Sequence, residues 1–270
     1  MASDPLLAEH RETARARSWL GATFAAALLV FPAGCIPLVA GANTYRPAGE
    51  LESRGNAMGV SLELGRVLTN GLAVSRPEDA AKNVWFGESI DGQFHVAHEL
   101  AVEASLLWAS AIPFLIPVPI GGRLGVRRGL LRQEAHGVSM DVAARGAYAS
   151  ASLKSGDQAA DGAWRLATKA MGAELELPVS YRPASWFAVT LTPFSRFYRV
   201  TAESKEVRSG ADVVRKDGVN VVSGGASLAL ELLAGPVAIA PALAIEAIYF
   251  PHDRVRMAQP MPGLSFGGRW

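Results

Sequence analysis

The chain has 270 residues, half of them hydrophobic, and its charge is nearly balanced, with 26 basic and 25 acidic side chains. Proteins that bind nucleic acid usually carry a basic excess on one face, so this balance argues against nucleic acid as a partner. The one cysteine, Cys35, excludes an internal disulfide and a cysteine-rich zinc site.

Residues 1–42 have the features of an export signal. Three arginines before residue 18 precede an uncharged segment, and its most apolar part, residues 19–31, has the length of a signal-peptide hydrophobic region. A membrane-spanning helix needs about 20 apolar residues, and Pro32 and Pro37 would interrupt one here. We therefore predict a signal-peptide helix that is removed, with an uncleaved anchor as the alternative.

Two cleavage positions compete. Ala40-Gly41-Ala42 fits the small-x-small pattern of ordinary signal peptidase and would leave residues 43–270 as the mature domain. The second position precedes Cys35, because Pro32-Ala33-Gly34-Cys35 resembles a bacterial lipobox. That resemblance implies lipidation of Cys35, which would then become the first residue.

From about residue 55 the chain alternates between apolar and polar residues with a period of two, which is typical of strands with two different faces. Residues 55–68 and 83–90 each form one such segment. Asp91-Gly92 predicts a hairpin turn, and a third strand follows over residues 94–108. The same alternation continues in seven further segments, which are 116–130, 138–150, 171–181, 187–192, 222–232, 237–249 and 264–270.

The connections between these segments alternate in length. Residues 132–135, 182–185 and 234–235 are short, whereas residues 154–162, 202–217 and 251–260 are long and polar. Short periplasmic turns and long extracellular loops give this alternation in transmembrane barrels. We predict an all-β fold, an antiparallel transmembrane up-and-down β-barrel of about ten strands, or of eight if the first two segments lie outside it.

Aromatic residues gather near the predicted strand ends, as in the interfacial belts of membrane barrels. One group contains Trp108, Phe114, Trp164, Phe197, Tyr198, Tyr249 and Phe250, and the other contains Tyr181, Trp186, Phe187 and Trp270. Five prolines conflict with a closed ladder, which has no edge strand to accommodate them. They are Pro117, Pro119, Pro178, Pro193 and Pro241.

The last nine residues, PGLSFGGRW, resemble the C-terminal strand of outer-membrane β-barrel proteins. Trp270 takes the position of the terminal aromatic, Leu264 and Phe266 take the alternating positions, and Gly268 departs from the pattern. The resemblance implies a location in the cell outer membrane, contact with its lipid and recognition by the barrel-assembly machinery. It implies no activity and no oligomeric state.

The polar face of the predicted strands would line the interior of the barrel. Its charged residues are Glu99, Glu103, Arg123, Arg127, Asp141, Arg145, Lys169, Glu174, Glu176, Glu231 and Glu246. Barrels of eight to ten strands have narrow interiors that side chains usually fill. We therefore expect an ion-paired plug, with a narrow polar pore as the alternative.

No motif in the chain predicts catalysis. His95 and Glu99 would share one strand face while His98 points to the other, and a Gly-x-Ser-x-Gly elbow is lacking. We predict no catalytic residue, metal or cofactor, and a non-enzymatic barrel with a structural or passive-pore role. The alternatives are a soluble or tethered periplasmic β-protein that binds apolar ligands, and a lipid-modifying enzyme of the outer membrane.

Overall fold

The computed structural model describes residues 56–66, 84–110, 118–155, 164–208, 211–251 and 255–270. The predicted signal peptide lies outside these residues, together with Cys35 and both candidate cleavage positions. Those three expectations therefore stay predictions.

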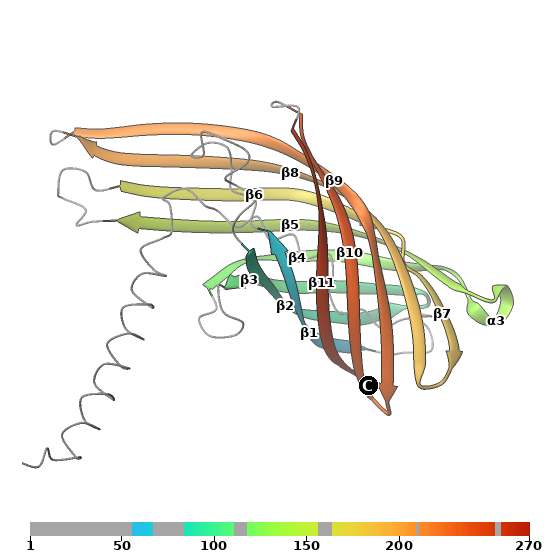
Figure 1. Cartoon of the computed structure of the whole chain (residues 1–270). Coiled ribbons are helices and arrows are strands. Elements are labelled where there is room, and N and C mark those ends of the chain that lie inside the picture. Colours follow the sequence, from blue (N-terminus) through green and yellow to red (C-terminus); the bar gives the residue numbers. More distant parts are fainter. Residues whose placement is uncertain (1–55, 67–83, 111–117, 156–163, 209–210, 252–254) are drawn as a thin grey trace, which may run out of the picture.

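The described chain forms a single antiparallel sheet (Figure 1). Its strands are β1 (Ala57–Arg66), β2 (Val84–Ala97), β3 (Leu100–Ser110), β4 (Val118–Leu131), β5 (Ser139–Ser155), β6 (Trp164–Glu176), β7 (Val179–Ala184), β8 (Phe187–Arg208), β9 (Ala211–Ala234), β10 (Val237–Phe250) and β11 (Val255–Arg269). The four-residue helix α3 (Gln133–His136) lies between β4 and β5. Within the described ranges, no helix has the length and apolarity needed to cross a membrane.

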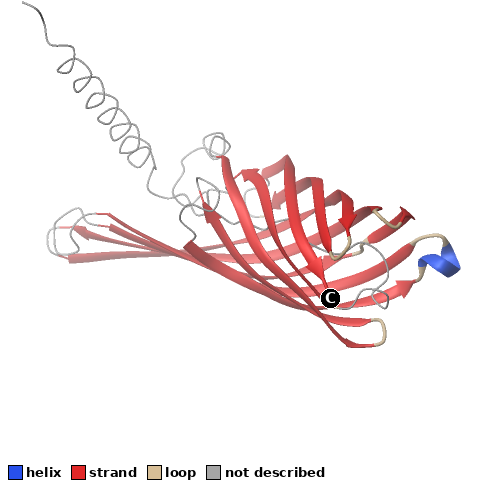
Figure 2. Cartoon of the chain, turned by 90° about the horizontal axis from the view of Figure 1, so that it is seen from below, coloured by secondary structure: helices blue, strands red, loops and turns tan. Residues whose placement is uncertain are grey.

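The sheet closes on itself because each strand pairs with the next around the barrel and β1 pairs with β11. β6 and β7 occupy one position in this order, since both lie between β5 and β8. The prediction of an all-β antiparallel barrel with ten strand positions is thus confirmed, and the eight-strand alternative is wrong. Figure 2 shows the curved wall from below.

Two prolines separate β6 from β7 without changing the register. The carbonyl of Pro178 accepts from Asp141 N on β5 at 2.9 Å, so the missing N–H of Pro178 lies on that side. On the other side, Pro193 O accepts from Leu177 N at 3.0 Å, and Pro193 has no N–H to return. The sheet therefore lacks one backbone hydrogen bond on each side of the segment between β6 and β7. The residue pairing continues across this gap, which explains how a closed barrel accommodates both prolines.

The predicted turn at Asp91-Gly92 is wrong. β2 runs through both residues, and the β2–β3 hairpin turns at His98 and Glu99, where Glu99 has a φ of 58°. The alternation gave no sign of this turn because even-numbered residues face outward on both sides of it. Ile90 on β2 and Leu106 on β3 are cross-strand partners, and both are exposed.

Residues 202–217 are also not a loop. Residues 202–208 form the end of β8 and residues 211–217 the start of β9, and the two strands pair from Arg208↔Ala211 onward. Beyond the residue pairs Gly121↔Ala149 and Tyr249↔Val222, four of the described strands continue for six or more residues. We call this extension the projecting sheet, and it consists of residues 150–155 of β5, 164–169 of β6, 201–208 of β8 and 211–218 of β9 (Figure 1).

Prolines also limit the seam between β1 and β11. Asn56 and Trp270 exchange both backbone hydrogen bonds, so even-numbered residues of β11 direct their N–H and C=O groups toward β1. Pro262 and Pro260 have even numbers and no N–H to offer there. The seam accordingly ends at Glu63↔Gly263, although β1 continues to Arg66 and β11 begins at Val255.

The two faces of the wall differ in polarity. Most buried side chains are polar or small, and a buried apolar cluster that includes Val200, Val221 and Ile248 accompanies them. The outer face exposes apolar side chains on every long strand, among them Leu124, Met171, Leu191, Leu230 and Ile245. Exposed Tyr181, Trp186 and Trp270 lie at the end with the short turns, and exposed Phe197 lies toward the other. Tyr198 departs from the predicted belt because its even number directs it inward, where it is 5% exposed.

Closure of the seam can be tested by a disulfide. Ser61 on β1 and Ser265 on β11 are cross-strand partners whose Oγ atoms lie 2.9 Å apart, at a position without backbone hydrogen bonds between them. Such pairs have Cα atoms about 4.5 Å apart, which a disulfide can bridge. In a Cys35→Ser background, we expect Ser61→Cys/Ser265→Cys to form the disulfide in the folded protein, detected by mass spectrometry after proteolysis.

The matched control is Ser61→Cys/Ser227→Cys. Ser227 is also buried on the inner face, but it lies on β9, three strand spacings of about 4.8 Å from β1. This pair should stay reduced. An open sheet would give no Ser61→Cys/Ser265→Cys disulfide and would contradict the closed barrel.

Candidate functional site

The inner face of the barrel carries a dense set of charged side chains. Twelve of them are at most 6% exposed among the described residues, and carboxylates outnumber guanidiniums by eight to four. They are Glu63, Asp91, Glu103, Asp141, Glu174, Glu176, Glu231 and Glu246, with Arg123, Arg127, Arg145 and Arg196.

The centre of this set is a lateral row of cross-strand partners. Moving across the wall from β3 to β9, the row contains Glu103, Gly125, Arg145, Glu174, Arg196 and Ser223. Opposite charges on directly paired residues attract, whereas like charges there would repel. The register of the sheet therefore places acids and bases in alternation along what we call the central row.

Arg145 connects two acidic residues. Its Nε donates to Glu103 Oε2 at 2.7 Å, and its Nη1 lies 2.8 Å from Glu176 Oε2. Gly125 separates Glu103 from Arg145 in the row, and a Cβ atom there would lie 2.5 Å from Arg145 Cγ. The missing side chain of Gly125 thus leaves the space through which Arg145 reaches Glu103.

Glu174 is the most highly connected carboxylate. Its Oε1 lies 3.0 Å from Arg123 Nε and 4.0 Å from Arg196 Nε, and it accepts a hydrogen bond from the Tyr198 hydroxyl. The ring of Tyr198 lies over Gly172, where a Cβ atom would be 2.5 Å from Tyr198 Cδ1. Glycine at that position lets the phenol lie flat enough to reach the carboxylate.

The row continues to β10 through Arg196. Its Nη1 donates to Glu246 Oε1 at 3.2 Å, and Ser223 Oγ donates to the same oxygen at 2.6 Å. The guanidinium also lies 4.3 Å from the centre of the Phe194 ring, in a cation–π contact. Arg196 is therefore held by Glu246, by its neighbour Glu174 in the central row and by the ring of Phe194.

Two further groups lie toward the short-turn end. Arg127 contacts Asp141 with two nitrogens, one of them Nε at 2.9 Å, and donates to Gln93 Oε1 at 3.0 Å. Arg269 donates to Glu231. These contacts join β2, β4 and β5 on one side of the barrel, and β9 and β11 on the other.

The structure brings nine of the eleven predicted interior residues to the inner face. They are Glu103, Arg123, Arg127, Asp141, Arg145, Glu174, Glu176, Glu231 and Glu246. Their placement follows from the alternation of side chains along a strand, because each is an even number of residues away from the other inward-facing residues of its strand.

Lys169 and Glu99 do not line the interior. Lys169 is exposed on the outer face with Met171, because its odd number on β6 places it opposite Glu174 and Glu176. Its charge, not its position in the alternation, led to the wrong assignment. Glu99 lies in the β2–β3 turn, where its Oε1 is 2.8 Å from Arg132 Nη2.

The predicted set of interior charges omitted Glu63 and Arg269, although both lie on the polar face of their predicted strands, and it also omitted Arg196, Tyr198 and Asp91. Arg196 continues the alternation of the predicted strand 187–192 on the side of its polar residues, so extending that strand by four residues would have found it. Asp91 was missed because it was assigned to a turn, whereas it accepts from Ser61 and Ser89 at 3.0 and 2.8 Å.

Histidines contribute little to this site. His98 lies in the β2–β3 turn, where its Nε2 is 2.6 Å from Arg132 Nη2, and His95 lies near the end of β2. Across the described ranges, no three His, Cys, Asp or Glu side chains are grouped so that they could hold a metal ion. The charged side chains of the interior are instead paired with one another across the strands.

Comparison with solved structures finds outer-membrane β-barrels. The chain resembles the outer-membrane protease OmpT from Escherichia coli, with 8% identity and a TM-score of 0.40 over 80% of this chain and 94% of that one. It also resembles the CymD monoaromatic hydrocarbon channel, with 12% identity and a TM-score of 0.30 over 80% of this chain and 89% of that one. The outer-membrane channel DcaP of Acinetobacter baumannii is more distant (8%, 0.23, 83% and 100%). The chain matches no protein-family profile and no curated protein sequence.

The contacts of Glu174 generate a stability prediction. Removing one partner from a buried ion pair leaves the other charge uncompensated, at a cost of about 3–5 kcal/mol. We expect Glu174→Gln to lower the free energy of unfolding by that amount, because Arg123 and Arg196 then lose their shared acid. Urea titration of the purified protein in detergent micelles, followed by tryptophan fluorescence, measures the change.

Glu203→Gln is the matched control. Glu203 forms a 3.0 Å pair with Lys216, but the two side chains are 50% and 73% exposed. Exposed pairs contribute less than about 1 kcal/mol, so this variant should unfold nearly as the wild type does. Equal effects of the two substitutions would show that the interior network does not hold the barrel together.

Proposed function

We propose that this chain is a non-enzymatic barrel of the outer membrane, with a structural role and a narrow passive path through its interior. The observation that carries the proposal is the inverted polarity of the wall, apolar outside and ion-paired inside. Soluble proteins bury apolar side chains, whereas transmembrane barrels direct them toward lipid.

The dimensions of the outer face support a membrane location. On β8 the outward residues are mainly apolar from Phe187 to Phe197, and they become polar at Arg199. The ten steps between these two residues, at about 3.3 Å each and tilted by about 40°, cover about 25 Å, which is the height of the apolar band in outer-membrane barrels. Exposed Tyr181, Trp186 and Trp270 lie where a belt of aromatic side chains would meet the headgroups.

The termini support one orientation. The start of β1 pairs with the end of β11, so both ends of the barrel sequence lie beside the short turns. In outer-membrane barrels that side faces the periplasm. Leu264, Phe266 and Trp270 remain our candidates for recognition by the barrel-assembly machinery.

The interior favours closure to all but small ions. The alternating contacts of the central row extend across the wall from β3 to β10, and they account for the buried arginines. Among the described residues, eight buried carboxylates exceed the four buried arginines together with Arg269, so the described part of the interior has a net negative charge. Any ion that passes should therefore be a cation.

The other two functions receive less support. A protein that binds apolar ligands inside its barrel needs an apolar cavity, whereas the interior here carries twelve buried charged side chains beside a buried apolar cluster around Val200, Val221 and Ile248. A lipid-modifying enzyme needs a nucleophile and a base near the apolar band. His95 and His98 are instead at the β2–β3 turn, where His98 contacts Arg132.

A conductance measurement tests the passive path. In planar bilayers, we expect the wild type to give a small, cation-selective conductance. Arg145→Ala/Arg196→Ala removes two side chains from the central row and should raise conductance several-fold, with a stronger preference for cations. Arg128→Ala is the control, because Arg128 is exposed on the outer face.

The same samples are run unboiled and boiled in SDS, because closed barrels resist SDS until they are heated. A variant that keeps this behaviour is folded, and its conductance can be interpreted. A wild type with the large, unselective conductance of an open pore would refute the plugged interior.

A further inference from the structure

Where the apolar band ends on β6, β8 and β9, the outer face becomes cationic. Met171, Phe197 and Val222 face outward at this boundary, and each is exposed. The next outward residues along the chain are Lys169 and Arg199. One two-residue step, about 7 Å along a strand, therefore separates apolar surface from positive charge.

Four successive rungs organise these charges. From the barrel outward they are Met171–Arg199–Asn220, Lys169–Thr201–Gly218, Ala167–Glu203–Lys216 and Arg165–Lys205–Val214. The ladder thus brings cations from three strands to one side of the projecting sheet, at its junction with the barrel. Lys169, which the sequence had assigned to the interior, belongs to this group.

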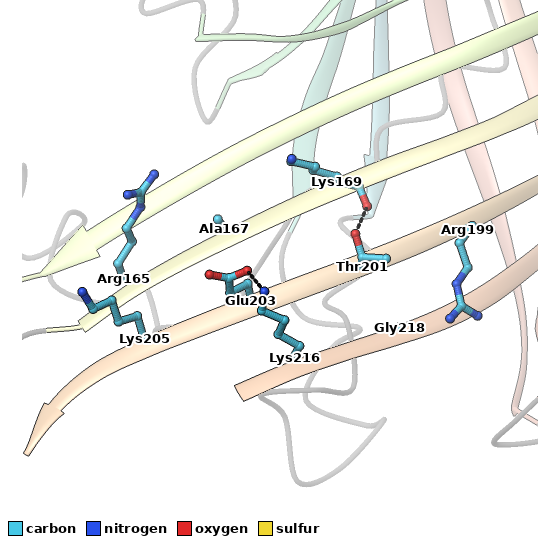
Figure 3. Close-up of a pocket in the computed structure, with 9 residues that line it drawn as sticks. All are labelled: Arg165, Ala167, Lys169, Arg199, Thr201, Glu203, Lys205, Lys216 and Gly218. Atoms are coloured by element: carbon cyan, nitrogen blue, oxygen red, sulfur yellow. Dashed lines mark hydrogen bonds and ion pairs between the residues drawn. The ribbon is translucent and has the colours of Figure 1, made fainter. Parts of the chain in front are cut away.

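The charges surround a hollow of about 740 Å³, open to solvent (Figure 3). Its lining contains five cationic side chains and one carboxylate, Glu203, which pairs with Lys216 at 3.0 Å. The remaining lining residues have short side chains or none, and they are Ala167, Thr201 and Gly218. We call this hollow the basic pocket.

Arg199 is already oriented over the pocket. Its guanidinium lies across Gly218, where a Cβ atom would be 2.9 Å from Nη2, and Nη1 donates to Asn220 Oδ1 at 3.0 Å. A guanidinium has five N–H donors in a planar fork, which suits the oxygens of a phosphate. Arg199 has donors beyond the one that contacts Asn220.

We propose that the basic pocket binds the phosphate headgroup of an anionic lipid in the outer leaflet. This inference depends on the proposed membrane location, which puts the pocket on the extracellular side. A lipid whose chains contact Met171, Phe197 and Val222 places its headgroup at the next rungs, beside Lys169 and Arg199. Phosphorylated glycolipids suit the site best, because they supply more than one phosphate to five cations.

Binding can be measured on the full chain in neutral detergent micelles by native mass spectrometry. The probes are diphosphorylated lipid A, the same lipid without phosphates, and inorganic pyrophosphate. We expect lipid A to bind at least tenfold more tightly than either of the other two. Equal affinity for pyrophosphate would overturn the lipid assignment, and equal affinity for the dephosphorylated lipid would overturn the role of the cations.

Substitutions of the charged residues that line the basic pocket test their part in lipid binding. Lys169→Gln/Arg199→Gln/Lys216→Gln should weaken lipid A binding at least tenfold. Glu203→Gln removes the one carboxylate of the lining and should tighten binding several-fold. Arg128→Gln, at an exposed arginine near the short-turn end, should have no effect. Unchanged binding in the triple variant, or weaker binding in Glu203→Gln, would overturn the inference.

Failure of the inference and failure of the proposed function give different results. If the wild-type protein does not bind lipid A but still resists SDS before heating and fractionates with the outer membrane, only the assignment of the basic pocket is wrong. If the protein is soluble in the periplasm and shows no heat-dependent shift in SDS, the membrane location is wrong and the lipid inference falls with it.

Discussion

Closure of the ladder between β1 and β11 is the constraint on which the rest of the structure depends. Where the ladder closes, no strand has a free edge, so the backbone groups of that part are satisfied within the wall itself. The seam has seven residue pairs, Ala57↔Arg269 to Glu63↔Gly263, and it ends where Pro262 lacks an N–H. Closure then defines an inside and an outside, and strand alternation assigns every side chain to one of them.

Once the faces are fixed, the register decides the chemistry of the interior. Buried charges are costly to remove from water, and their mutual attraction offsets that cost only when the geometry is good. The central row provides this geometry, since Arg145 meets Glu103 and Glu176 while Arg196 meets Glu246. A shift of one residue in a single strand would send its charges to the outer face.

Much of this could be predicted from the sequence, because a period of two is visible in a single chain. Asp141, Arg145 and Glu231 were assigned to the interior by parity alone, and the number of strand positions was correct. The β2–β3 turn was not visible, because outward parity is unchanged across His98 and Glu99. The ends of β8 and β9 were taken for a loop, since charged residues on both faces there remove the contrast between the faces. Contacts between specific side chains, such as Tyr198 with Glu174, depend on tilt and register that a pattern does not contain.

The projecting sheet makes the described wall unequal in height. β5, β6, β8 and β9 continue past the level at which β4 and β10 stop pairing with their neighbours. In Figure 1 these four strands run well beyond the rest. The rim formed by the described strands is therefore slanted. In the proposed membrane location, the four long strands would carry their paired backbone farther from the membrane than β1 to β4 do, so any contact made by the projecting sheet would lie on one side of the barrel axis.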